Sequence, residues 1–433
     1  MEQPAKLLNR NYLLQWQGQS ISRLGSQAFA VAMLFWIKHA TGSAALMGLL
    51  QMLSTLPAVL LTPIGGAVAD RYSRRKIIIF SDLLRGIAVL SLAGLMSMAP
   101  DATQVTLVWL FVVSILITVI TTFFGPAISA TIPDLVPKDK VAAANSLGQL
   151  SFQLSVFIGQ GLGGMLFRLL GAPLLFLING VSYLYASASQ TFVVIPQVIP
   201  ERSSGWKEQF LEFRMDILEG LRYVWHREGL RETVFVSAFL GFFTAPIIIL
   251  LPFYVEDVLQ AKVDWYGFIL AVSGLGALLG YLFVGAIRLS GKARGRVMMA
   301  FIILQAAGYG VLGLVRNPTM AVALAFLGGF TSGFVTVNIT TIVQITTPGE
   351  IRGRVFGLLA AISGSLTPIA MGLAGVVADL VNQNIPLIYV SCGAIMTLLS
   401  VLVSLSRDFH GFLAHDQKGE IPHGVKEQVV ALD

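Results

Sequence analysis

Three charged side chains stand inside long apolar stretches of the sequence, where ionised groups are rare. Arg23 lies near the middle of the stretch 12–37, with Gln27 one helical turn further on. An arginine in such surroundings faces a cavity or a partner. We therefore expect it either to contact an anionic or polar ligand or a coupling network, or to pair structurally with an acid or a helix end. Asp82 and Arg85 are three residues apart and form a pair on one helix face. This pair either supports a gate structurally or carries a proton on Asp82.

Uncharged amide side chains form a second group of candidate contacts. Gln149 and Gln153 are four residues apart and share a helix face, which Asn145 continues. Asn338 stands in a later apolar stretch. Amide groups with few charges suit a cavity for an amphipathic compound, so we expect these four residues to line one.

The densest motif joins two apolar stretches and runs Gly-Ala-Val-Ala-Asp-Arg-Tyr-Ser-Arg-Arg-Lys from Gly66. Its small residues let helices approach closely. Asp70 can accept hydrogen bonds from Arg74 or face a helix N-terminus across an interface, which would latch one conformation. Arg71 and Arg75 help to orient the chain in a membrane, but orientation does not explain Asp70. The motif therefore predicts a conformational gate.

Residues for enzyme chemistry are sparse. None of the five histidines pairs with another at metal-ligand spacing in a suitable site, and no phosphate-binding loop of the G-x-x-x-x-G-K type occurs. The single cysteine, Cys392, excludes an internal disulfide and a cysteine-based zinc site. We expect no enzyme activity, no metal, no cofactor and no ATP-driven step within this chain.

Composition identifies the elements that must position these residues. Of the 433 residues, 55% are hydrophobic and 12% are charged, and the mean hydropathy is +0.77. These charges are too few to cover the surfaces of soluble domains. A helix that crosses a membrane needs about 20 mostly apolar residues. Twelve stretches are predicted to be such helices: 12–37, 44–69, 77–99, 105–130, 142–168, 173–195, 231–254, 265–287, 297–315, 319–346, 354–380 and 386–406.

The distribution of positive charge orients these spans. Most of the 29 lysines and arginines lie in connecting segments on one side, while Lys38, Arg168, Lys262 and Arg316 lie on the other. The positive-inside rule places the first side in the cytoplasm, together with both termini because the number of spans is even. The basic pI of about 9.4 then reflects orientation and contact with anionic lipid, and nucleic acid is not an expected partner.

The chain divides into two similar halves. Gly-Ala-Val at 66–68 and Gly-Ala-Ile at 285–287 each precede a basic turn, which indicates a duplicated unit. Parallel halves around a site are a transporter architecture. We predict an N-terminal six-helix bundle at 1–195, a cytoplasmic linker with an amphipathic helix at 196–230, a C-terminal six-helix bundle at 231–406 and a cytoplasmic tail at 407–433.

The motif that starts at Gly66 resembles the G-x-x-x-D-R-x-G-R-[RK] loop of the major facilitator superfamily, with Ser73 where glycine is usual. Segments at 81–85, 132–137, 219–224 and 352–356 are similar to the drug and siderophore exporter branch, which includes macrolide efflux proteins and enterobactin exporters. The resemblance covers nearly the whole chain. It implies an all-α membrane protein with the major facilitator fold of twelve transmembrane helices, both termini in the cytoplasm, and transport by alternating access.

The segment from Gly159 to Gly164 resembles the antiporter motif of drug exporters, with Gln160 in place of the expected proline. The resemblance implies that Gly159, Gly163 and Gly164 pack helices closely, while the bend that a proline would cause is lost. The fourth predicted span carries no arginine or acid, although many antiporters of the superfamily place an arginine there. The resemblance therefore implies proton coupling, but no obvious carboxylate in the predicted spans demonstrates it.

The sequence thus predicts a secondary transporter of the bacterial plasma membrane that exports a small amphipathic compound, either drug-like or a secondary metabolite, by proton-coupled antiport. One alternative is export of an anionic siderophore or lipid-like metabolite, with Arg23 at the anion. A more distant alternative is a membrane sensor of the same fold that does not transport. The expected partners are the small-molecule substrate, protons and membrane lipids, and we expect a monomer.

Overall fold

The computed structural model describes residues 6–197, 215, 218–219, 221–227, 229–286, 289 and 291–413. Helices joined by short turns make up this part of the chain, and it contains no strand. Most of the predicted linker helix and of the predicted tail lies outside the described residues. The N-terminal half contains α1 (Arg10–Thr41), α2 (Ala44–Arg71), α3 (Arg74–Met98), α4 (Thr103–Leu135), η1 (Lys138–Lys140), α5 (Val141–Gly161) and α6 (Gly163–Thr191). The C-terminal half contains α8 (Leu230–Ile249), α9 (Leu251–Phe253), η2 (Tyr254–Val258), α10 (Asp264–Ala286), α11 (Gly291–Leu314), α12 (Pro318–Thr346), α13 (Gly349–Leu380), α14 (Ile385–Ser404) and α15 (Arg407–Leu413).

Helix ends follow local turn chemistry. The side chains of Asn9, Ser43 and Ser73 accept hydrogen bonds from backbone N–H groups in the first turns of α1, α2 and α3, the usual role of these residue types at an N-cap. Gly42 ends α1 with φ at 64°, a left-handed conformation that glycine adopts without a Cβ penalty. The turn between α1 and α2 is therefore short and well defined.

Ten helices in the described part of the chain are long and apolar enough to cross a membrane. Shorter apolar stretches, Ala44–Ala58 and Ser365–Leu380, lie in α2 and α13, at the two other predicted spans. The count of twelve spans stays a prediction.

The fifth and sixth predicted spans are separated by a turn inside α6. Gly171 there has φ at 70° and ψ at 169° and interrupts the helix. Phe167 before this turn packs on Phe35 of α1, and Phe176 after it packs on Phe29. The chain therefore runs up along α1, reverses at Gly171 and returns along α1.

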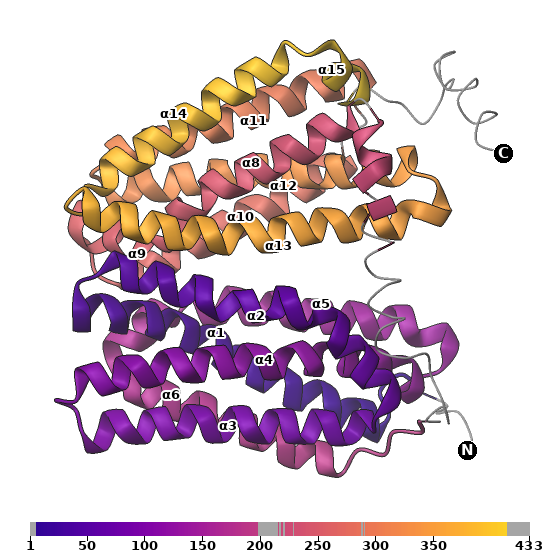
Figure 1. Cartoon of the computed structure of the whole chain (residues 1–433), viewed down its shortest axis with the longest axis vertical. Coiled ribbons are helices and arrows are strands. Elements are labelled where there is room, and N and C mark those ends of the chain that lie inside the picture. Colours follow the sequence, from indigo (N-terminus) through magenta and orange to yellow (C-terminus); the bar gives the residue numbers. More distant parts are fainter. Residues whose placement is uncertain are drawn as a thin grey trace.

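The two halves pack their helices in the same pattern and form two neighbouring bundles (Figure 1). In the N-terminal half, α1 packs on α5 and α6, α3 packs on α4 and α6, and α2 packs on α4. In the C-terminal half, α8 packs on α13 and α14, α11 packs on α12 and α14, and α10 packs on α12. The helices correspond in chain order, as expected of a duplicated unit.

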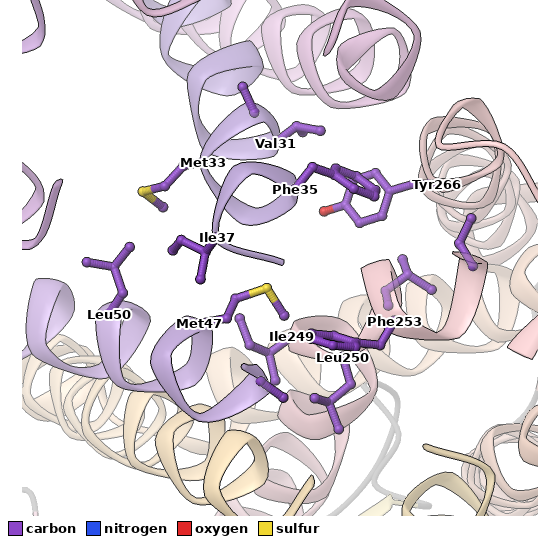
Figure 2. Close-up of a cluster of buried hydrophobic side chains, with 14 of the residues drawn as sticks. Val31, Met33, Phe35, Ile37, Met47, Leu50, Ile249, Leu250, Phe253 and Tyr266 are labelled. Carbon is purple, nitrogen blue, oxygen red and sulfur yellow. The ribbon is translucent and has the colours of Figure 1, made fainter. Parts of the chain in front are cut away.

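The halves meet at one end of the molecule, which we call the sealed end (Figure 1); it holds the turns at 42–43, 259–263 and 381–384. The opposite end, where α1 begins and α15 lies, is called the terminal end. One cluster of buried side chains joins both halves at the sealed end, including Phe35 and Met47 from one half and Leu250, Phe253 and Tyr266 from the other (Figure 2). None of the other buried clusters among the described residues joins the two halves. The halves therefore share a core at the sealed end and keep separate cores toward the terminal end.

Candidate functional site

An ionic cluster crosses between the halves at the sealed end. Lys38 Nζ, at the last turn of α1, lies 2.7 Å from Glu256 Oε2 and 2.9 Å from Asp257 Oδ1. His39 Nε2 lies 2.9 Å from Glu256 Oε1. Lys38 is only 8% exposed, and its ammonium lies 5.0 Å from the centre of the Phe253 ring. A partly desolvated group of this kind binds its partners more strongly than a surface ion pair does.

The two carboxylates of this cluster are presented by a local departure from α-helical geometry. Glu256 and Asp257 lie in η2, a single π-helical turn that follows α8 and α9; such turns often occur at functional sites. Burial raises the pKa of Glu256, but the hydrogen bonds and charges of His39 and Lys38 outweigh burial, so the net shift of this pKa is downward. Glu256 is therefore held as a carboxylate facing Lys38.

A third carboxylate joins the halves by capping a helix. Asp379, near the end of α13, accepts a hydrogen bond from Ser43 Oγ at 2.6 Å and from the backbone N–H groups of Ala44 and Ala45 at 3.0 Å each. These groups form the N-terminus of α2, where the helix dipole favours a negative charge. Gln383 in the following turn donates to the carbonyl of Gly42. Asp379 is thus an anion on a helix N-terminus across the interface.

Main chain approaches main chain closely in the same region. A Cβ added to Gly48 would clash with the carbonyl oxygen of Met371, and one added to Gly375 would clash with that of Ala44. Gly164, one of the predicted packing glycines, lies in the same way against Val263 of the C-terminal half. The contacts between the halves at the sealed end, which we call the seal, therefore combine ion pairs, a helix cap and close contacts that only glycine permits.

The other two predicted packing glycines lie within the N-terminal half. Gly159 lies against Gln27 and Leu24 of α1, and Gly163 lies against Val31 of α1.

The predicted gate motif lies at the terminal end. The side chain of Asp70 is outside the described side chains, and Arg71 is the last residue of α2. Arg74 donates to Asp134 Oδ2 at 2.8 Å and to the carbonyl of Ala130 at 2.9 Å. Arg75 donates to the carbonyl of Thr191 at the end of α6.

These contacts join α3 to α4 and to α6 within one half. A Cβ at Gly66 would meet no neighbour within 4 Å. The predicted latch on Asp70 stays a prediction.

Arg23 lies between α1 and α5, inside the N-terminal half. Arg23 Nη1 donates to the carbonyl of Gly148 at 3.2 Å, and the guanidinium is 5.9 Å from the centre of the Phe152 ring. The neighbouring turns of α1 place Gln19 on Asp82 and Ser26 on Tyr183, so this face of α1 points into the bundle. No carboxylate lies within ion-pair distance of Arg23 among the described side chains.

Asp82 and Arg85 meet in the interior of the same half. Asp82 is fully buried and accepts from Arg85 Nη2 at 2.6 Å and from Gln19 Nε2 at 3.1 Å. The Arg85 guanidinium lies 4.1 Å from the centre of the Phe124 ring and 4.7 Å from that of Tyr183. A buried ion pair with these extra contacts has its charges satisfied.

The predicted amide group is split by the structure. Asn145, Gln149 and Gln153 are exposed on α5, beside the positions that contact Arg23. Gln27 accepts a hydrogen bond from Gln160 Nε2 at 2.7 Å. Asn338 is buried in α12 and donates to the carbonyl of Phe334 in its own helix. The α5 amides thus share their helix with the two residues that contact Arg23, and Asn338 is bonded elsewhere.

Sequence reasoning missed the seal residues. In the sequence Lys38 indicates only the orientation of the chain, although Lys38 and His39 follow the first predicted span and Glu256 and Asp257 follow the seventh. Spans one and seven occupy equivalent positions in a duplicated chain. The opposite charges at the ends of these two equivalent spans are therefore the sequence signal that could have indicated the contact. No cluster of potential metal ligands occurs among the described residues.

The fold described above is found in solved transporter structures. A bacterial homologue of the iron transporter ferroportin, in an inward-facing state, has a TM-score of 0.71 at 15% identity, with 93% of this chain and 100% of that chain covered. A bacterial homologue of the human lysosomal transporter Spinster, inward-facing and unoccupied, has a TM-score of 0.65 at 16% identity, with 95% and 98% covered. The chain has the same fold as these solved transporters.

Comparison of sequences identifies the family. The family described as transmembrane secretion effector matches residues 4–432, and the chain belongs to that family. It is 26% identical to the multidrug efflux pump Tap of Mycolicibacterium fortuitum over 82% of this chain and 86% of the relative. It is 25% identical to macrolide efflux protein A of Streptococcus pyogenes over 85% and 89%. The resemblance to major facilitator proteins read from the sequence is confirmed.

Proposed function

We propose that this protein is a secondary active exporter that moves a small amphipathic compound out of the cell by alternating access. The positive-inside distribution assigns the terminal end to the cytoplasm and the sealed end to the outside. The observation that carries the proposal is that, among the described residues, the halves share one core at the sealed end and have separate cores toward the terminal end. Two rigid bundles joined at one end can rock about a site between them. The names of the efflux relatives support the outward direction of transport.

The proposed driving force is the proton gradient, with substrate and proton moving in opposite directions. The test is uptake of a labelled macrolide into proteoliposomes with an imposed pH difference, the macrolide class being the one in the streptococcal relative's name. Flux should follow the size and sign of the pH difference. Flux that is indifferent to this difference would refute proton coupling.

The motif at Asp70 is proposed as the latch of the opposite, outward-open conformation. An aspartate on a helix N-terminus across the interface is the arrangement that Asp379 makes at the sealed end, and it supports this reading of Asp70 by analogy. Asp70→Asn should abolish transport and leave abundance in the membrane unchanged. Transport that persists in this variant would show that the latch is wrong.

Arg23 favours a second candidate, an exporter of acidic or carbonyl-rich compounds. Its guanidinium has five N–H donors, and the Gly148 carbonyl takes one of them. Gln149 and Gln153 follow Gly148 and Phe152 directly in α5, and their amides would offer further donors to an anion. Arg23→Gln should reduce transport of anionic compounds more than that of cationic compounds of equal size. Equal losses for both would make Arg23 a structural residue.

A further inference from the structure

The interior of the N-terminal half contains a column of buried polar side chains from α1, α3 and α6. At its centre Asp82 is 0% exposed and accepts hydrogen bonds from Arg85 and Gln19. A carboxylate this far from water is unusual inside a membrane helix and marks a functional site by default. The question is whether Asp82 only neutralises Arg85.

Arg85 is anchored by groups other than Asp82. Its guanidinium lies against the Phe124 ring of α4 and the Tyr183 ring of α6, and its Nε donates to the carbonyl of Ser81 at 3.2 Å. Cation–π contacts of this kind are strongest where the cation is desolvated. The arginine can therefore stay in place when Asp82 takes up a proton, so neutralising the carboxyl does not release an unheld cation.

Three buried amides of α1 and α6 have polar atoms without a partner: Gln15, Gln190 and, one turn before Tyr183, Asn179. Gln15 is 4% exposed and Gln190 is 1% exposed. Gln15 Oε1 and both polar atoms of the Gln190 side chain are buried and make no hydrogen bond to the protein. In native proteins such groups are satisfied by ordered water. The column therefore contains more polar atoms than its own contacts use.

Helix register places Gln15 and Gln190 between Asp82 and the terminal end. Ser189 donates to the carbonyl of Leu14, and Ser187 to that of Ile79, so α6, α1 and α3 are level at these positions. Asp82 is three residues beyond Ile79, or roughly 4.5 Å closer to the sealed end. Gln15 is one turn before Gln19, and Gln190 is two turns after Tyr183, on the same faces. The amides thus continue the column from Asp82 toward the terminal end.

The groups that face this carboxyl from each packed helix are few. They are Gln19 from α1, Arg85 from α3 and, across Arg85, Phe124 from α4 and Tyr183 from α6. Within the described part of the chain no second acid contacts Asp82 or Arg85. A proton that enters this interior has one carboxylate to bind.

We propose that Asp82 is the proton-binding site that couples this transporter to the pH gradient, with Gln15 and Gln190 lining a water path from it to the cytoplasm. The proposal rests on the proposed exporter function. One proton binds one carboxylate oxygen while the outside is open. It leaves along the water path in the sealed conformation described here, where the carboxylate accepts from Arg85 and Gln19.

The first experiment needs no substrate. Infrared difference spectra of the purified full-length protein in nanodiscs, recorded during a pH titration, should show the carbonyl stretching band of a protonated carboxyl shielded from water. Asp82→Asn should remove this band and Asp82→Glu should restore it at a shifted position. Asp134→Asn, which removes a half-exposed carboxylate at the terminal end, should leave it in place. A band that survives in Asp82→Asn would overturn the proposal.

The second experiment separates coupling from transport itself. In proteoliposomes with a labelled macrolide, Asp82→Asn should lose uptake driven by the pH gradient and keep exchange of labelled for unlabelled macrolide at the wild-type rate. Gradient-driven uptake in this variant, or loss of exchange by correctly folded protein, would overturn the proposal. A wild-type protein that exchanges macrolide but ignores the gradient would instead refute the proposed coupling, whatever the infrared band shows.

A further variant protects the test against misfolding of Asp82→Asn. Gln190→Leu keeps the carboxyl and replaces an unpartnered amide by an apolar group of similar size. Gradient-driven uptake should slow, exchange should stay unchanged, and hydrogen–deuterium exchange of the infrared band should slow with it. An unchanged rate of both uptake and band exchange would overturn the water path.

Discussion

Replacing Lys38 by methionine should open the sealed end. Methionine keeps much of the apolar stem and removes the ammonium that binds Glu256 and Asp257 at 2.7 and 2.9 Å. Removing one partner of a fully buried pair costs about 3–5 kcal/mol. Glu256 and Asp257 are 20% and 52% exposed, and Glu256 keeps His39, so we expect a smaller loss of about 2 kcal/mol for the sealed conformation.

This loss has a measurable effect on the populations of the two conformations. Since about 1.4 kcal/mol is a factor of ten, about 2 kcal/mol shifts the equilibrium roughly 30-fold. An open population of about 1% would rise to about a quarter of the molecules. Pulsed electron resonance can measure this change with spin labels at Asp101→Cys and Thr319→Cys, two exposed positions at the sealed end of the two halves, in a Cys392→Ala background.

Lys262→Met is the matched control, because Lys262 is an exposed lysine at the same end and has no ion pair with a described residue. Its distance distribution should equal that of the parent protein. Combining Lys38→Met with Glu256→Gln should cost less than the sum of the two single changes, since the pair is then absent altogether. An unchanged distribution in Lys38→Met, or an equal change in Lys262→Met, would refute the assignment of Lys38 to the seal.

Three further predictions concern the same end. Gly375→Val should prevent closure, because its side chain would meet the carbonyl of Ala44; the same label pair should report the long distance, while Gly274→Ala, with open space around it, should not. Asp379→Asn removes the charge from the N-terminus of α2 and should weaken the seal by about 1 kcal/mol, seen as faster hydrogen exchange at residues 44–47 and disproved by unchanged protection there. The lowered pKa of Glu256 means that its contribution to the seal is complete above the ordinary value of 4.5 and is lost as the pH falls through the lowered pKa. Label distances should therefore be constant near neutral pH and lengthen only in acid below 4.5, and lengthening between neutrality and that value would contradict this.

Hydropathy predicts the helices well because it sums a weak signal over many residues. The predicted span 44–69 corresponds to α2 (Ala44–Arg71), and the break predicted between 168 and 173 corresponds to the turn at Gly171. The pairing of Asp82 with Arg85 could be foreseen as well, since three residues on one helix fix their separation. Features of this kind depend on local sequence alone.

The seal could not be predicted in the same way. Lys38 and Glu256 are 218 residues apart, and each alone looks like an ordinary charge at the rim of a membrane span. The lack of hydrogen-bond partners for the amides of Gln15 and Gln190 could not be predicted from the sequence either, because their environment depends on how three helices pack. Contacts between halves depend on the conformation that the two bundles adopt, which one sequence pattern does not encode.

The glycines of the sealed end also affect how well the membrane holds its ion gradients. Bacterial membranes store energy as ion gradients that other pumps and synthases use. A continuous water-filled path through one protein would conduct ions and discharge these gradients. Where Gly48 and Gly375 bring main chain against main chain, the path is closed without any movement of a side chain. A larger residue there would create a leak conductance, and cells that express it should grow poorly even when no compound needs to be exported.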